Sequence, residues 1–295
     1  MINDENHESI ACRTSALGGL LRSLSLSSST MLTKQRFLPF CLAVTLLMPV
    51  VTKAQTAAGE VATAVAPASG AAPLANGNDG DNCHPPIDLA KPQFIVGYGS
   101  LMQTASKRST EPNAGENLPV LVTGFQRAWN THGVYPTCYL GVQPSPAATM
   151  VAALYRSFPE DGKLSADARE IDYCRAAVAA DSVKMLDASS VPADSQIWIY
   201  VNKPDTLKAP DQGHPIVQSY VDIVIIGCME LQQRVADPEL DFVEQCVKTT
   251  AGWSKHWVND RLYPRRPYTH QPQAFQIDRH LQRLLPELME SARIE

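Results

Sequence analysis

The chain has 295 residues, of which 44% are hydrophobic and 19% are charged, and its formal net charge at pH 7 is −5. These values are typical of a globular protein with enough apolar residues for one fair-sized domain or two small ones. A negative net charge is unfavourable for binding the phosphate backbone, so we expect no nucleic-acid partner.

The N-terminal region has the pattern of an export signal. Residues 31–54 begin with Met31, carry Lys34 and Arg36, continue through an apolar stretch over 37–51, and end in small residues. The apolar stretch is about fifteen residues long and contains two prolines, whereas a membrane-spanning helix needs about twenty residues. We therefore predict a signal peptide that is cleaved near Ala54, no stable membrane anchor, and a periplasmic or secreted protein.

The segments on either side of this signal have different compositions. Residues 1–30 are rich in serine, and we expect them to be a non-native extension before a true start at Met31; an unusually long signal peptide is the alternative. Residues 55–82 are mostly Ala, Gly, Thr, Pro and Asn, which predicts a flexible linker. Without residues 1–54 the 25 basic and 30 acidic residues fall by five and three, to 20 and 27, which gives a net charge of −7.

Strands are expected first along the folded part. Residues 93–98 are predicted to form a strand that leads into a glycine-containing turn. β-Branched and aromatic residues between Pro, Gly and Ser predict further strands, over 120–130, 137–143, 150–156, 175–180 and 195–201. A helix is expected over 163–173, with Ser165 as a possible N-cap.

Helices are expected in the remainder of the chain. Apolar residues spaced through 216–231 predict a helix that is buried on much of its circumference, and further helices are expected over 238–250 and 273–292. Strands followed by helices indicate the α+β class, with a mainly antiparallel sheet or a small barrel.

The turn after the first strand, G-Y-G-S-L-M, has several interpretations. A dinucleotide-binding fingerprint is excluded because Met102 occupies the third glycine position, and a nucleophile elbow because Ser100 is flanked by Tyr98 and Met102 where glycines are needed. Two interpretations remain. The turn either only ends the strand, or its backbone N–H groups bind an anion or a carboxylate.

A second motif favours a binding site. Residues 167–175 have the form D-x-x-E-x-x-Y-x-R, and together with Y-G-S-L they resemble the γ-glutamylcyclotransferase-like family over residues 93–201. G-F-Q-R-A-W-N at 124–130 is similar to the family's second strand. The resemblance implies a small β-barrel with flanking helices over 83–213, no cofactor, and conversion of a γ-glutamyl amide to 5-oxoproline and a free amine. Residues 214–295 resemble the helical extension of an exported bacterial branch, packed on that core.

The resemblance also implies roles for single residues. Glu170 is the expected general acid/base, which takes a proton from the substrate's α-amine and returns it to the leaving amine. Because both reacting groups belong to one molecule, no metal or covalent nucleophile is needed. The expected substrate-binding residues are Tyr98, Gly99, Ser100, Leu101 and Tyr173.

Asp167 has two interpretations. On a helix it shares a face with Glu170 and Tyr173, and its negative charge would make Glu170 a stronger base. Alternatively, Asp167 forms a structural ion pair with Arg169 or Arg175.

Other reactive side chains are assigned structural roles. Five cysteines follow residue 54, an odd number that permits one or two disulfides, and Cys138 and Cys174 are expected to be buried thiols. The histidines show no ligand spacing, so no metal site is expected. A basic and aromatic patch is expected to pack the tail on the core through stacked arginines, or alternatively to contact an anionic substrate group; its members are Trp253, Trp257, Arg261, Tyr263, Arg265 and Arg266.

The function expected from these motifs is cyclisation of a γ-glutamyl peptide or amine. The alternative is a non-catalytic module that uses the same fold to hold an acidic small molecule or a protein partner. The presence of Glu170 within its motif favours the enzyme. The sequence indicates neither the leaving amine nor any particular protein partner.

Overall fold

The computed structural model describes residues 83–133, 135–265 and 273–295. The expected N-terminal extension, signal peptide and linker lie outside the described residues and stay predictions. No helix in the described ranges is both long enough and apolar enough to cross a lipid bilayer.

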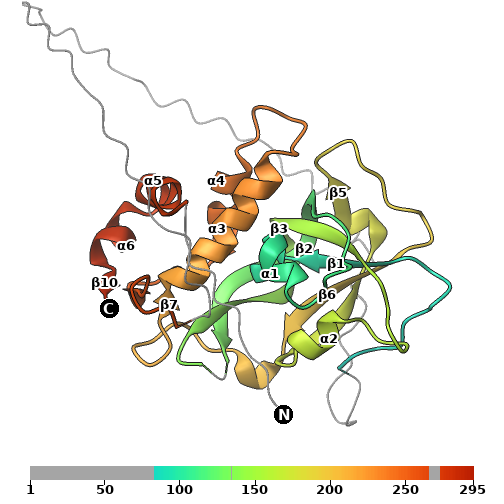
Figure 1. Ribbon diagram of the computed structural model, residues 1–295, viewed down its shortest axis with the longest axis horizontal. Coiled ribbons are helices and arrows are strands. Elements are labelled where there is room, and N and C mark those ends of the chain that lie inside the picture. The colour runs from blue at the N-terminus through green and yellow to red at the C-terminus, as the bar shows by residue number, and fades with distance from the viewer. Residues whose placement is uncertain (1–82, 134, 266–272) are drawn as a thin grey trace, which may run out of the picture. The chain divides into compact units, whose positions relative to one another are not determined.

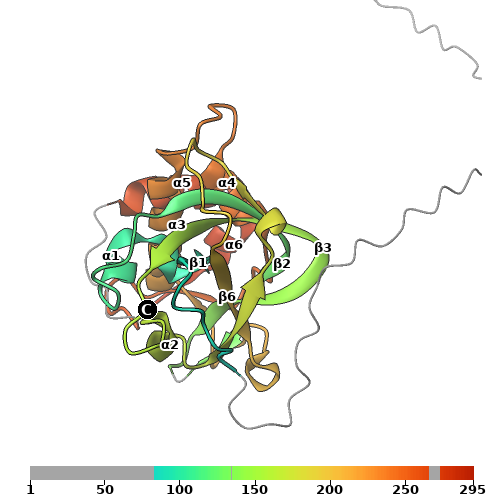
Figure 2. The same cartoon turned by 90° about the vertical axis from the view of Figure 1, so that its right-hand side faces the viewer.

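A seven-stranded sheet forms the first part of the fold (Figures 1 and 2). Its strands are β1 (Gln93–Gly97), β2 (Leu118–His132), β3 (Cys138–Ser157), β4 (Tyr173–Val178), β5 (Val183–Met185), β6 (Gln196–Asn202) and β8 (Thr250–Ala251). The order is β4-β6-β1-β3-β2-β5, with β8 beside β2. The β1–β6 and β2–β8 pairs are parallel, and the other pairs are antiparallel. The mainly antiparallel α+β prediction is confirmed. In the described part of the chain no pairing joins β4 to β5, so a closed barrel is not found.

The longest strand corrects one sequence prediction. Separate strands were expected over 137–143 and 150–156, but β3 runs through both. Its register against β2 shifts between Thr123 and Phe125, where Gly124 has a φ of +92° that favours glycine. Pro144 pairs with Phe125 directly after this shift, a position at which a residue without an N–H is tolerated.

Four helices from the second half of the chain lie together beside the sheet (Figure 1). They are α3 (Gln218–Gln232), α4 (Phe242–Lys248), α5 (Ala274–Leu284) and α6 (Pro286–Ser291). The buried helix expected over 216–231 is confirmed as α3, except that its first two residues form β7 (Ile216–Val217). The helix expected over 273–292 is divided at Pro286, because proline has no N–H to continue the α-helical hydrogen bonds.

The remaining elements are short. A second sheet of three strands contains β7, β9 (Trp257–Asn259) and β10 (Arg293–Ile294). The short helices and 3₁₀ turns are η1 (Ser100–Met102), α1 (Thr104–Arg108), α2 (Ala166–Arg169), η2 (Ala180–Ser182) and η3 (Pro204–Thr206).

Two disulfides cross-link the described part of the chain. Cys83 is bonded to Cys174, which ties the segment before β1 to the start of β4, and Cys228 is bonded to Cys246, which joins α3 to α4. The expectation of one or two bridges is confirmed. The expectation of a free buried thiol at Cys174 was wrong because Cys174 forms a disulfide, and the local sequence contained no sign of a partner 91 residues away. Cys138 is a free, buried thiol, as expected.

The two described arginines of the basic and aromatic patch form ion pairs within the tail, and Arg265 also donates to the Pro136 carbonyl of the core at 2.7 Å. Arg261 pairs with Asp222 of α3 and Asp278 of α5, at 2.7 and 2.8 Å. Arg265 pairs with Glu295 at 2.6 Å. The aromatic part stacks on itself, since the rings of Trp253 and Trp257 lie 5.3 Å apart at 22°. Arg266 lies outside the described residues.

Candidate functional site

The turn after β1 is a 3₁₀ turn packed under α3. Tyr98, Leu101 and Met102 are buried, and Ser100 is partly exposed. A Cβ at Gly99 would lie 2.8 Å from the Tyr220 hydroxyl oxygen, so a larger residue there would displace Tyr220. Glycine therefore allows the backbone of this turn to approach α3 closely.

The segment that carries Glu170 differs from the predicted helix over 163–173. Helix α2 ends at Arg169, Glu170 is its C-cap with φ −93° and ψ 39°, and Tyr173 already begins β4. The helix ends early because residues from Tyr173 onward pair with β6, starting with Tyr173 opposite Asn202. Asp167, Glu170 and Tyr173 therefore do not share a helical face, which corrects the sequence expectation.

The structure nevertheless places all six predicted site residues around one cavity. This cavity has a volume of about 30 Å³ and is lined by Tyr98, Gly99, Ser100, Leu101, Leu140, Glu170, Tyr173, Tyr200 and Tyr220. Among these residues Glu170 is the only carboxylate. The chemical roles of the six residues stay predictions.

An outer cleft of about 270 Å³ adjoins the inner cavity. The two share Ser100, Glu170, Tyr173 and Tyr220. The other residues that line the outer cleft are Thr131, Gly133, Tyr135, Tyr139, Arg169, Ile171 and Asp172. Glu170 therefore lines both the outer cleft and the inner cavity.

Arg169 connects the turn to the carboxylate. Its Nη2 donates to Ser100 Oγ at 2.8 Å and its Nη1 to the Ser106 carbonyl at 2.7 Å, while its Nε lies 3.3 Å from Glu170 Oε1. The side chains of Arg169 and Glu170 are 13% and 14% exposed. One guanidinium thus fixes Ser100 and Glu170 relative to each other. From the sequence, Arg169 was expected only as a possible partner of Asp167, and its place directly before Glu170 was the available signal.

Asp167 forms a structural ion pair with Arg175, which was the second of its two interpretations. Both of its carboxylate oxygens accept hydrogen bonds from Arg175 Nη1 at 2.6 Å, and Oδ1 also accepts from the Tyr200 hydroxyl at 2.6 Å. The Arg175 side chain is 3% exposed. The negative charge of Asp167 therefore compensates the positive charge of the buried Arg175 guanidinium. Glu170 is not the only group on which this charge acts.

We expect Asp167→Asn to lower the free energy of unfolding by about 1–3 kcal/mol, because the amide leaves Arg175 buried without a negative partner. Urea unfolding of the two proteins would measure this loss. A variant as stable as the parent would mean that the ion pair contributes nothing measurable.

Tyr98 and Tyr173, which line the cavity, are neutral. Burial, followed by the nearby Tyr173 and Glu170, raises the pKa of Tyr98 well above its usual value, and burial also raises the pKa of Tyr173. The Tyr98 hydroxyl donates to the Tyr200 carbonyl at 2.7 Å, and the Tyr173 hydroxyl to the Leu140 carbonyl at 3.0 Å. Both phenol protons are used in holding the walls of the cavity together.

Arg127 supports the turn from behind. It lies in β2, within the G-F-Q-R-A-W-N segment, and is completely buried. Its guanidinium donates to the carbonyls of Tyr98, Val151 and Cys246, at 3.1, 3.0 and 2.7 Å. Burial lowers its pKa to about 10, so the side chain is still positively charged at neutral pH.

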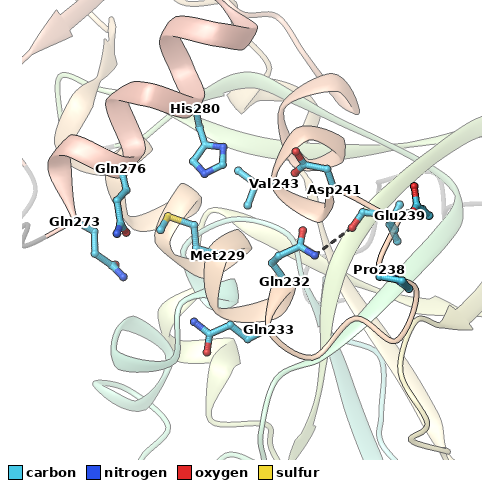
Figure 3. Close-up of a pocket in the computed structure, with 11 residues that line it drawn as sticks. Met229, Gln232, Gln233, Pro238, Glu239, Asp241, Val243, Gln273, Gln276 and His280 are labelled. Atoms are coloured by element: carbon cyan, nitrogen blue, oxygen red, sulfur yellow. Dashed lines mark hydrogen bonds between the residues drawn. The ribbon is translucent and has the colours of Figure 1, made fainter.

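Two other features do not form part of this site. Burial raises the pKa of the Cys138 thiol to about 12, which makes it a poor nucleophile. A larger pocket of about 650 Å³ lies between α3, α4 and α5, where glutamines, Asp241 and His280 line it (Figure 3). None of the predicted site residues contributes to that pocket.

Comparisons with known proteins give similarity to solved structures only. No family model matches the chain, and no curated protein matches it. The chain is similar to a gamma-glutamyl cyclotransferase, with 13% identity and a TM-score of 0.40 over 65% of this chain and 99% of that one. It is similar to an uncharacterized protein of Homo sapiens, with 12% identity and a TM-score of 0.38 over 64% and 99%. It is also similar to a yeast gamma-glutamyl cyclotransferase specific to glutathione, with 11% identity and a TM-score of 0.33 over 54% and 95%.

Proposed function

We propose that this protein is an exported γ-glutamylcyclotransferase-like enzyme that converts a γ-glutamyl peptide or amine into 5-oxoproline and a free amine. The observation that carries the proposal is that Glu170 and residues 98–101 line one cavity, with Arg169 bonded to both sides. The proposal rests on these residues of the chain itself.

Glu170 is the general acid/base of the proposed reaction. The α-amine of the substrate is protonated at neutral pH, and Glu170 removes one proton so that the nitrogen can attack the γ-carbonyl carbon. A new C–N bond closes the five-membered ring, and the ring nitrogen releases its second proton to water. Glu170 then gives the proton that it holds to the leaving nitrogen as the bond from that nitrogen to the γ-carbon breaks. Holding the folded conformer of one molecule supplies most of the remaining catalysis.

The start of η1 is the proposed glutamyl-binding element. The N–H groups of Met102 and Gln103 already donate to the carbonyls of Gly99 and Ser100, at 3.0 and 3.3 Å. The first amides of a helical turn have no partner within the turn. We therefore assign the Ser100 and Leu101 N–H groups to the substrate's α-carboxylate or to the oxyanion that develops on the γ-carbonyl.

The outer cleft is the proposed place of the leaving group. Its volume of about 270 Å³ is close to the lower end of the roughly 300–1,000 Å³ typical of small-molecule sites. Tyr135, Tyr139 and Ile171 give it an apolar part that suits a peptide or an organic amine. Because the glutathione pool is mostly cytosolic, export favours γ-glutamyl or cell-wall-derived peptides as substrates.

The division of the chain is part of the same proposal. We assign residues 83–213 to the family core and 214–295 to an extension that packs on it. Strands β1 to β6 and α2 come from the first range, and α3 to α6 from the second. Strand β8 of the extension pairs with β2 of the core.

A panel assay tests the function. The purified mature protein is incubated with γ-glutamyl peptides and amines, and 5-oxoproline is measured. Formation of 5-oxoproline together with an equal amount of free amine supports the proposal.

The binding module is the second candidate. The inner cavity of about 30 Å³ holds one or two water molecules, so a glutamyl group enters it only if the walls move. A wall that does not move would favour binding in the outer cleft without turnover. Binding of γ-glutamyl compounds without any 5-oxoproline would favour this candidate.

Export has its own test. Expressed from Met31 in a Gram-negative host, the protein is expected to reach the periplasm with a mature N-terminus near Gln55, because residues 31–54 have the pattern of a signal peptide. Mass spectrometry of the periplasmic protein measures the cleavage site. A chain that keeps Lys34 to Lys53 would contradict this prediction.

A further inference from the structure

Two histidines and an aspartate meet outside the candidate active site. One ligand atom each from His132, Asp211 and His214 lies within 4.8 Å of the others. His214 Nδ1 is 3.7 Å from Asp211 Oδ1, and the rings of His132 and His214 are stacked with centroids 4.2 Å apart. Ligand atoms around one tetrahedral ion, with bonds of about 2.0–2.2 Å, lie roughly 3.3–3.6 Å from one another. Small side-chain movements would therefore bring these three groups around a single ion.

The backbone holds the three residues in place. His132 is the last residue of β2, and the other two belong to the loop after η3. The Lys208 N–H donates to the Asn130 carbonyl at 2.9 Å, which fixes this loop against the strand. The His214 N–H donates to Asp211 Oδ1 at 2.7 Å, which orients the carboxylate. Ligands on a rigid strand and a tethered loop are preorganised for binding.

The hydrogen bond of His132 determines its tautomer. Its Nε2 lies 2.8 Å from the Ala209 carbonyl oxygen, which only accepts hydrogen bonds. In the neutral ring Nε2 therefore carries the proton and Nδ1 keeps its lone pair. Histidines that ligate metals usually donate their other ring N–H to a carbonyl or a carboxylate in this way.

We propose that His132, Asp211 and His214 form a binding site for a divalent transition-metal ion such as Zn²⁺, with water completing the coordination. Two imidazoles and one carboxylate suit zinc, copper or nickel, whereas magnesium and calcium prefer oxygen ligands alone. The sequence did not suggest this site because only Asp211 and His214 are close in sequence, and β2 supplies the third ligand.

An ion at this site would cross-link the end of β2 to the loop over 208–214. Thr131 and Gly133, on either side of His132, line the outer cleft. Metal binding would therefore also fix one wall of that cleft. The site does not depend on the proposed cyclotransferase activity, and metal binding can be measured without a substrate.

The test is a zinc titration of the tag-free mature protein against a chromogenic chelator, together with the visible spectrum of the Co²⁺ form. We expect one Zn²⁺ per chain. Loss of an outer-shell partner of a metal site costs roughly 10–100-fold in affinity, so we expect His214→Gln and His132→Gln to lose at least that much and to lose the Co²⁺ bands. His256→Gln, which alters an exposed histidine outside the cluster, should bind as the parent does.

Several results would overturn the proposal. One is that the parent protein binds zinc no more tightly than His214→Gln does. Another is that His256→Gln loses as much zinc affinity as His214→Gln does. If His132→Gln fails to fold, as circular dichroism would show, Asp211→Asn and His214→Gln decide the question. Their side chains are 58% and 36% exposed in the parent, so these variants are expected to fold. Retention of zinc affinity and Co²⁺ bands in both variants would exclude the site.

Discussion

Glu170→Gln is expected to lower the rate of 5-oxoproline formation by roughly 10²–10⁴-fold. Glutamine keeps the size of the side chain and can still accept a hydrogen bond from Arg169, but its amide is no base at neutral pH. The protein is expected to stay folded, since Glu170 lies at the end of α2 and beside a cavity rather than in the core. Steady-state kinetics on whichever γ-glutamyl compound the panel identifies would measure the effect.

The control for this variant is Glu160→Gln. It makes the same chemical change at an exposed position that does not line the cavity, and turnover should not change. Substrate affinity should fall much less than turnover in Glu170→Gln, because the amides of Ser100 and Leu101 are proposed to hold the glutamyl group. Turnover at the parental rate in Glu170→Gln would show that another group is the base.

The close placement of the two motifs in the fold could be predicted, because the family resemblance implies that they form one site. Residues 98–101 and Glu170 are about seventy positions apart, and no local pattern in either stretch specifies that they meet. The family resemblance implied it, and the structure has both around one cavity. The spacing of apolar residues was sufficient to predict α3 as a buried helix, and twelve of its fifteen residues are buried.

Long-range pairing explains where the sequence was misleading. Residues 163–173 contain helix formers, but β6 pairs with the chain from Tyr173 and ends the helix after one turn. The Cys83–Cys174 disulfide and the Asp167–Arg175 ion pair lie in the same region and depend on that pairing. Arg169 reaches Ser100 only in the folded chain, so its bridging position could not be predicted from local sequence.

Arg127→Met is the substitution for which we expect the largest loss of stability, more than about 3 kcal/mol of the free energy of unfolding. Methionine keeps the length of the side chain and packs in the core, but it donates no hydrogen bond. The carbonyls of Tyr98 and Val151 would lose their guanidinium partner, and each buried acceptor left unpaired costs about 1–3 kcal/mol. The Cys246 carbonyl would lose one of two donors and keep the Thr250 hydroxyl. Relief from burying a positive charge offsets part of this cost. Urea unfolding would measure the net change.

Arg156→Met is the matched control, because Arg156 lies on β3 and is exposed. The free energy of unfolding of Arg156→Met should differ from that of the parent by no more than about 0.5 kcal/mol. The two variants also distinguish a loss of overall stability from a loss of order at the site. Arg127 joins the turn after β1 to β3 and to α4, so its loss should affect that turn in particular. In folded Arg127→Met, hydrogen exchange should therefore be faster at residues 99–103 than in the parent, in excess of any general rise across β1 and β3. If Arg127→Met is as stable as Arg156→Met and exchanges like the parent at those residues, Arg127 does not hold the glutamyl-binding turn in place.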